Sequence, residues 1–150
     1  MILTLIAVDK LRQPHFRNGV DDYVKRIRKF LPFEQIEVAA SAGEDAAKRE
    51  AAAMSRVLPN GGKIVALDPQ GKLFTTDQFF VWFEQMMNAA VPRLTFVIGG
   101  AAGRHDSVLQ AADMRLSLSP LTLPHELARL VLVEQLYRVL TLWKGLPYHK

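Results

Sequence analysis

Three glycines directly follow an uncharged run of the chain, a combination typical of a ligand-binding turn. Residues 94–98 are uncharged and mostly apolar, and Gly99, Gly100 and Gly103 come next. The β-branched residues of the run favour a strand buried on both faces of a parallel sheet. Glycines at the carboxyl end of such a strand let the backbone approach a bound nucleotide-like cofactor closely. A tight turn that needs glycine for steric reasons alone explains these residues equally well.

A second candidate for ligand binding is the loop of residues 119–123. It contains two leucines, a proline, a serine and a threonine, and it carries no charge. Surface loops are normally polar, so we expect another molecule to cover this one. Either a bound cofactor or a partner chain would do so.

Several other chemistries are excluded or disfavoured by their motifs. The chain has no Walker phosphate loop, no Gly-x-Ser-x-Gly elbow and no His-Glu-x-x-His zinc motif. The glycines at 99, 100 and 103 differ from the dinucleotide fingerprint and follow a fourth strand instead of a first, which disfavours an NAD enzyme. The four histidines, His15, His105, His125 and His149, lack the spacing of metal ligands.

Composition indicates a single domain spanning residues 1–150. With 49% hydrophobic and 23% charged residues, a chain of this length can bury a sizeable core. There is no cysteine, which excludes disulfides and is compatible with a reducing cytosol. The apolar amino-terminal run is too short for a membrane span and lacks a basic flank, so we expect a cytoplasmic protein without a membrane partner.

The charge of the chain favours a polyanionic partner weakly. The net charge is +4, and four cations lie close together between residues 25 and 29. These cations can contact RNA, or they can simply complement the dipole at a solvated helix end.

The order of strand and helix patterns predicts an α/β fold, with a mostly parallel sheet flanked by helices. Asp68 ends the third strand, where parallel sheets usually bind ligands, and a turn is expected at 69–72. Helix starts are indicated by capping-box spacing at Ser41–Glu44 and Thr75–Gln78. Strands are expected at residues 1–8, 33–38, 63–68, 94–98 and 114–118, and helices follow each of them, the last running from 124 to about 144.

The last helix is too apolar to pack on one side only. Six apolar residues from 132 to 143 form one wide band, and five more lie largely outside it. One face can meet the sheet, and the other most simply meets a second copy of the chain, because closed two-fold dimers are the commonest oligomers. We therefore expect a homodimer whose interface includes Leu136 and Trp143.

Motifs in the carboxyl-terminal half carry a resemblance to a known family. They are Ile98-Gly99-Gly100-Ala101-x-Gly103, Leu116-Ser117-Leu118-Ser119, Leu123-Pro124-His125 with Arg129, Glu134-Gln135-x-Tyr137-Arg138 and Gly145-x-Pro147-Tyr148-His149-Lys150. On these motifs, and over essentially its whole length, the chain resembles the ribosomal RNA large subunit methyltransferase H family. Two positions depart from the family pattern: Asp9 stands where glycine usually follows the first strand, and Val139 stands where alanine is common.

The resemblance implies a SPOUT-type fold, in which the carboxyl-terminal part of a dimeric enzyme forms a trefoil knot that holds S-adenosylmethionine. It further implies transfer of a methyl group from that cofactor to N3 of a pseudouridine in 23S ribosomal RNA. The substrate would be the RNA within the assembled ribosome, and no metal would be required.

The resemblance also implies two sets of site residues. In the catalytic set, His149 and Tyr148 would lie near the target base, and Arg138 and His125 would bind phosphate or orient the substrate. In the cofactor set the pocket would be lined by Leu67, Gly99, Leu118, Ser119, Pro120, Leu121, Thr122 and Leu123.

Several alternatives to these roles remain open. The tail that carries Tyr148 and His149 can be a frayed end, Arg138 a surface charge and His125 a polar residue near a helix start. As for function, a non-catalytic RNA-binding or ribosome-binding dimer and a nucleotide-dependent oxidoreductase also stay possible.

Overall fold

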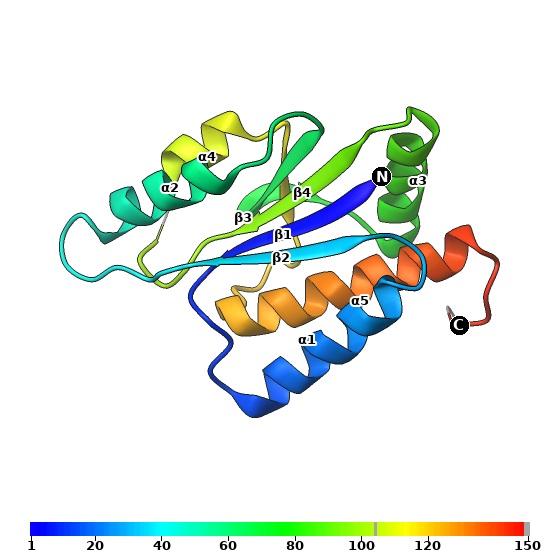
Figure 1. The fold of residues 1–150 in the computed structure, drawn as a ribbon, viewed down its shortest axis with the longest axis horizontal. Helices are drawn as coiled ribbons and strands as arrows, with labels where there is room; N and C mark the ends of the chain where they lie inside the picture. Colours follow the sequence, from blue (N-terminus) through cyan, green and yellow to red (C-terminus); the bar gives the residue numbers. More distant parts are fainter. Residues whose placement is uncertain (104, 149–150) are drawn as a thin grey trace.

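The computed structural model describes residues 1–103 and 105–148, which form an alternating series of strands and helices (Figure 1). Each element lies where the sequence patterns indicate it, with one longer strand and a few shifted helix ends. The strands are β1 Ile2–Val8, β2 Phe33–Val38, β3 Lys63–Leu73, β4 Arg93–Ile98 and β5 Met114–Ser117. The helices are α1 Pro14–Ile27, α2 Ala46–Val57, α3 Thr76–Asn88, α4 Asp106–Ala111 and α5 His125–Trp143.

The strands form one parallel sheet in the order β2-β1-β4-β3-β5. The interior strands β1 and β4 are the most apolar and are almost entirely buried, as the uncharged runs at residues 1–8 and 94–98 predict. Because all strands run in the same direction, the carboxyl ends of β3, β4 and β5 meet at one edge. The predicted α/β class with a parallel sheet is confirmed.

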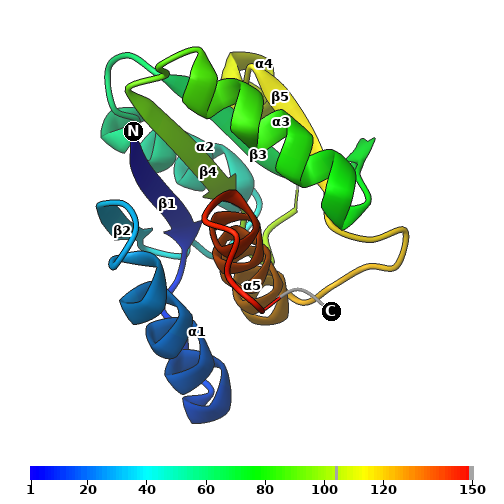
Figure 2. The same ribbon diagram turned by 90° about the vertical axis from the view of Figure 1, so that its right-hand side faces the viewer.

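Helices cover both faces of the sheet (Figures 1 and 2). Helices α2 and α4 lie on one face, while α1, α3 and α5 lie on the other, with α5 packed against both α1 and α3. Alternation along β1 sends Leu3 and Leu5 into the core with α5, and Ile6 and Val8 into the smaller core under α2. None of the helices in the described residues is long and apolar enough to span a membrane.

Two local predictions differ from the structure. Strand β3 does not end at Asp68: its pairing with β5 is interrupted between Leu67 and Lys72 and then resumes as far as Leu73. The expected capping box at residues 41–44 is also wrong, because α2 begins at Ala46 and no side chain caps it. Helix α3 does have its predicted capping box, with Thr75 as the cap.

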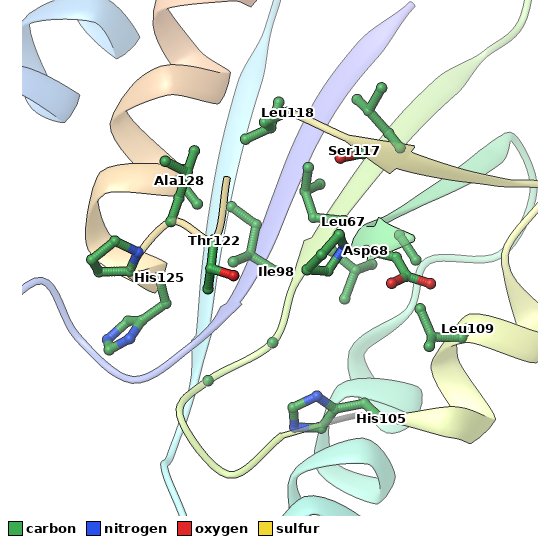
Figure 3. A pocket seen from close by; sticks show the side chains of 18 of the residues that line it. Leu67, Asp68, Ile98, His105, Leu109, Ser117, Leu118, Thr122, His125 and Ala128 are labelled. Carbon is green, nitrogen blue, oxygen red and sulfur yellow. The ribbon is translucent and has the colours of Figure 1, made fainter. Parts of the chain in front are cut away.

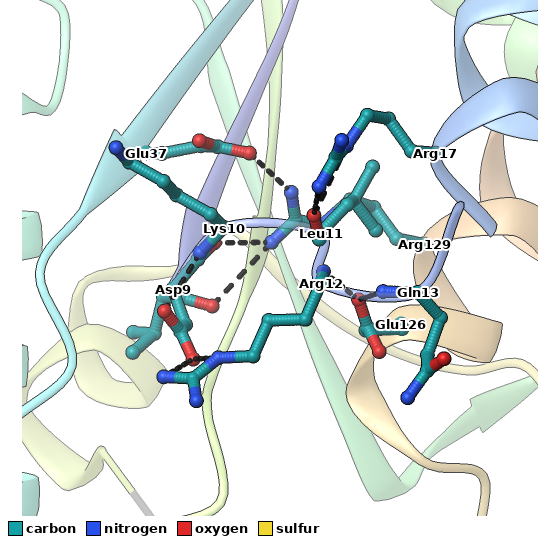
Figure 4. Close-up of polar contacts among 10 residues, drawn as sticks. Asp9, Lys10, Leu11, Arg12, Gln13, Arg17, Glu37, Glu126 and Arg129 are labelled. Atoms are coloured by element: carbon teal, nitrogen blue, oxygen red, sulfur yellow. Dashed lines mark hydrogen bonds and ion pairs between the residues drawn. The ribbon is translucent and has the colours of Figure 1, made fainter.

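The loop after β1 is held by a buried arginine (Figure 4). The guanidinium of Arg129 donates to the carbonyl oxygen of Asp9 over 2.7 Å and pairs with the Glu37 carboxylate over 2.7 Å. Asp9 has a φ of +68°, in the left-handed region that favours glycine. A short polar side chain tolerates this region better than most, which explains how aspartate can stand at this position.

Substitutions at Asp9 test this backbone requirement. We expect Asp9→Gly to change the free energy of unfolding by less than about 1 kcal/mol, because the lost Asp9–Arg12 ion pair is exposed. Asp9→Val should cost about 1–2 kcal/mol more than Asp9→Gly, because a β-branched residue is strained at positive φ. Urea unfolding of the three proteins measures both, and equal stability of the valine and glycine variants would contradict the argument.

Candidate functional site

A pocket of about 580 Å³ opens at the sheet edge where β3, β4 and β5 end (Figure 3). The glycine turn after β4 forms one side, the loop after β5 covers it, and the first turn of α5 closes it. Its size is that of a typical small-molecule site. The lining residues lie within 66–69, 97–101, 103, 105, 108–109, 116–119, 121–125 and 128.

The walls of the pocket are mostly apolar. Leu67 comes from β3 at the point where its pairing with β5 is interrupted, Ile98 ends β4 and Leu118 follows β5. Leu109 of α4 lies opposite the first turn of α5. On the covering loop, Leu121 keeps 76% of its surface exposed. Apolar walls of this kind suit the flat face of a purine, whereas the polar groups at the edges can fix its orientation.

Seven of the eight residues predicted to contact a cofactor line this pocket. Ser119 shapes the loop, because its hydroxyl oxygen accepts a hydrogen bond from the Leu121 N–H over 2.9 Å. Pro120 lies within that turn, is exposed, and is not among the lining residues. That the residues bind a cofactor stays a prediction. The seven are Leu67, Gly99, Leu118, Ser119, Leu121, Thr122 and Leu123.

The glycine turn shows a steric need for glycine and also lines the pocket. A Cβ on Gly99 would lie 2.5 Å from Nδ1 of His105, and one on Gly100 would lie 2.7 Å from Cγ1 of Val8. Both glycines also line the pocket. The chain therefore needs glycine here for packing whether or not a ligand is bound.

A buried hydrogen-bonded pair of side chains that no motif indicates supports the same turn. Nε2 of His105 lies 2.7 Å from the Glu50 carboxylate, and the two side chains are only 6% and 1% exposed. The other carboxylate oxygen of Glu50 accepts from the Ser41 N–H over 2.9 Å. His105 lines the pocket directly, so the pair connects α2 to the pocket wall.

Asp68 supplies a carboxylate within the pocket lining, next to Leu109 in Figure 3. Its Oδ1 accepts a hydrogen bond from the Gln70 N–H over 3.0 Å. Its Oδ2 is buried, and none of the residues that the structure describes forms a hydrogen bond with it. Such an acceptor is what a hydrogen-bond donor on a bound nucleoside would satisfy, so the residues present fit a nucleoside-type cofactor.

Three of the four predicted catalytic residues lie in the described part of the chain, and these three do not all meet within one chain. His125 lines the pocket, whereas Arg138 and Tyr148 lie elsewhere on α5 and its tail. The Glu134 carboxylate accepts from the Arg138 guanidinium over 2.6 Å and from the Tyr148 hydroxyl over 3.2 Å. Glu134 is nine residues beyond His125, which is about 13 Å along the helix axis. His149 lies outside the described residues.

The environment of Tyr148 makes it a hydrogen-bond donor. Burial raises the pKa of its phenol well above the usual range, and the hydrogen bond with Tyr23 and the negative charge of Glu134 act in the same direction. The Arg138 guanidinium lies 4.9 Å from the Tyr148 ring centre, and its hydrogen bond to Glu134 raises the pKa of Arg138. This arrangement therefore presents a neutral phenol beside a permanent cation, with both groups hydrogen-bonded to the Glu134 carboxylate.

Part of the basic cluster at the end of α1 is engaged within the chain. Arg26 pairs with Asp22 over 2.6 Å, and Arg28 donates to the carbonyl oxygen of Phe33 over 3.2 Å. Among the described residues, no group of three or more histidine, cysteine, aspartate or glutamate side chains is arranged to hold a metal ion.

Comparison with known proteins shows which enzymes are similar to this chain in sequence and in fold. A family model described as "Predicted SPOUT methyltransferase" matches residues 1–149. Proteins named ribosomal RNA large subunit methyltransferase H are similar over the full length. The protein from Thermus thermophilus is 41% identical, covering 100% of this chain and 99% of its own, and that from Lysinibacillus sphaericus is 36% identical, covering 100% of both.

Solved structures share the fold at low sequence identity. A probable methyltransferase from Bordetella pertussis superposes with a TM-score of 0.60 at 11% identity, covering 92% of this chain and 93% of that one. A probable methylase family protein from Haemophilus influenzae gives 0.58 at 9% identity, covering 99% of this chain and 70% of that one.

Proposed function

The chain belongs to the SPOUT methyltransferase family, and from this premise we propose that it methylates N3 of a pseudouridine in 23S ribosomal RNA. S-adenosylmethionine is the methyl donor in this family. The observation that carries the proposal is the pocket at the carboxyl ends of β3, β4 and β5, whose volume and apolar walls suit an adenosine group. The names of the full-length relatives supply the RNA substrate.

The cofactor, when bound, supplies an already activated methyl group on a sulfonium. The protein therefore has to hold the two reactants in line and exclude water. Leu67, Leu118 and Leu123 would enclose the adenosine group, and the Gly99 backbone would approach it closely. Arg138 and Tyr148 would orient the RNA, one as a cation and the other as a hydrogen-bond donor.

We propose that the protein acts as a homodimer through the outer face of α5. Leu136 is fully buried in the core of its own chain, so the expectation that it lies at the interface is wrong. The partly exposed face carries Leu127, Val131 and Leu142 at helical spacing, on the side away from the sheet. Trp143, at the end of α5, is partly buried against the same core and keeps some surface free.

A dimer of this kind would complete the site. The Tyr148 and Arg138 cluster lies along α5 and away from the pocket of its own chain, and a two-fold axis beside α5 would bring it towards the partner's pocket. The proposed active site is thus shared: the cofactor pocket and His125 come from one chain, and Arg138 and the tail come from the other.

A charge on the outer face of α5 should separate the dimer. We expect Val131→Asp to convert a micromolar dimer into monomers, because an interface of apolar side chains cannot accommodate an unpaired carboxylate. Val81→Asp provides a matched control, since Val81 is 50% exposed on α3. Sedimentation equilibrium measures both variants, and a dimer of unchanged affinity for Val131→Asp would exclude this face.

Ribosomal RNA from cells with and without this protein tests the function. Mass spectrometry should find a methylated pseudouridine in 23S RNA only when the protein is present, and purified ribosomes lacking it should accept the methyl group in vitro. Calorimetric binding of NAD in place of S-adenosylmethionine would favour an oxidoreductase. RNA binding without methyl transfer would favour a non-catalytic ribosome-binding dimer acting in the cytoplasm.

A further inference from the structure

The orphaned carboxylate oxygen of Asp68 points to a specific contact with the ligand. We infer that Asp68 is a cofactor-recognition residue, whose Oδ2 accepts a hydrogen bond from a donor on the adenosine half of S-adenosylmethionine. This inference rests on the proposed function of the pocket and assigns to Asp68 a role beyond those of the predicted pocket residues.

The position of Asp68 is fixed by the local backbone. The residue is 7% exposed, and the hydrogen bond from the Gln70 N–H to Oδ1 holds the carboxylate in one orientation. It follows Leu67 directly and lies where the pairing of β3 with β5 is interrupted. The interruption frees the backbone around Asp68 from the sheet and lets this residue form part of the pocket wall.

Within residues 1–103 and 105–148, no group donates a hydrogen bond to the other oxygen, Oδ2. Arg115 forms the ion pair that the structure shows with Asp68, but its Nη1 lies 3.9 Å from Oδ2, which is too long for a hydrogen bond. The Arg115 side chain is 43% exposed and lies outside the pocket lining. A buried acceptor without a partner costs free energy, so it is retained most simply because a bound ligand satisfies it.

The surroundings of Asp68 favour the nucleoside half of the cofactor over its amino-acid half. Asp68 lies beside Leu67 and Leu109, within the apolar wall that suits a purine and its ribose (Figure 3). The amino-acid half carries an ammonium as well as a carboxylate, and burying these charged groups against an apolar wall would cost free energy. The ribose hydroxyls and the exocyclic amine are therefore the donors that fit.

Two ligands and one conservative substitution test the assignment. S-adenosylhomocysteine and 5′-methylthioadenosine share the adenosine half, but only the first has the amino-acid half. In calorimetry, Asp68→Asn should weaken both by a similar factor of roughly tenfold to a hundredfold, as for loss of a hydrogen bond to a charged group. Analogues of methylthioadenosine that lack the 2′-hydroxyl, the 3′-hydroxyl or the exocyclic amine then identify the donor. The analogue that lacks the donor should bind the wild type and Asp68→Asn with the same affinity.

Two controls distinguish a role of Asp68 in ligand recognition from a purely structural role. In Asp68→Asn the amide oxygen of the new side chain can still accept from the Gln70 N–H, so the ligand-free variant should melt no lower than the wild type. Arg115→Ala should leave both affinities unchanged; if it reproduces the Asp68→Asn effect, the ion pair with Arg115 explains Asp68 and the inference is overturned.

Other results of the binding measurements would contradict either the inference or the proposed function of the pocket. Weaker binding of S-adenosylhomocysteine alone would place Asp68 at the amino-acid half and refute the inference, as would unchanged binding of both ligands. Failure of the wild-type protein to bind either ligand would instead refute the proposed function of the pocket.

Discussion

Deleting residues 148–150 should reduce methylation of ribosomes on the order of a hundredfold or more, because loss of a positioning group or of a preorganised hydrogen-bond donor each costs about that much in catalysis. Dimerisation and most of the S-adenosylmethionine affinity should survive, because the deletion removes no pocket residue and leaves the outer face of α5 intact. Methyl incorporation into ribosomes lacking the modification measures the loss. Near-normal turnover by the truncated protein would show that the tail is a frayed end.

A mixing experiment asks whether the tail acts on the partner's pocket. The truncated chain is combined with a full-length chain carrying Gly99→Val, so that a heterodimer has one intact pocket and one intact tail on different chains. If the site is shared, this mixture regains activity that neither variant has alone. Confirmed heterodimers without recovery would mean that each site is built within a single chain.

Tyr148→Phe separates the hydroxyl from the rest of the tail. This variant keeps an aromatic ring beside Arg138 but loses the donor that now contacts Glu134. An activity loss comparable to that of the deletion would assign the effect to the hydroxyl, and retained activity would assign it to the residues that follow.

Gly99→Val should weaken S-adenosylmethionine binding on the order of a hundredfold, an effect at the upper end of those caused by overpacking. The reason is specific: an added Cβ lies 2.5 Å from Nδ1 of His105, and the His105 ring is held in place by Glu50. Either the ring is displaced or the glycine turn moves into the pocket, and both change the shape of the site. Calorimetry with the folded variant measures the loss, and unchanged affinity would remove the basis for placing the cofactor here.

His105→Ala in the same background identifies the cause. If the collision with the ring is responsible, removing the ring should restore much of the affinity of Gly99→Val. No restoration would mean that the valine occupies space needed by the cofactor itself. His105→Ala alone provides the reference value for both comparisons.

Local patterns in the sequence were sufficient for the elements. A strand such as β4 is recognisable because an uncharged run, residues 94–98, ends at glycines, and α5 because its apolar residues recur at helical spacing. The general rule that parallel sheets bind ligands at the carboxyl ends of their strands indicated the glycine turn and Asp68 as candidates. The full set of pocket residues, including Leu67 and Leu118, came from the resemblance to a known family, and the structure places most of that set in one pocket.

The sequence by itself determined the α/β class, the parallel sheet and the apolar pocket loop, because each depends on residues close together in the chain or on a general rule of sheet topology. Only the tertiary structure decided which distant residues meet. Glu50 and His105 are 55 residues apart and pair because α2 and α4 cover the same face of the sheet. Leu136 is buried within its own chain because α1 and α3 enclose α5, and Tyr148 is kept from its own pocket because its hydroxyl bonds to Glu134, halfway along that helix. Contacts of this kind depend on how whole elements pack in space, which no short-range pattern in the sequence records.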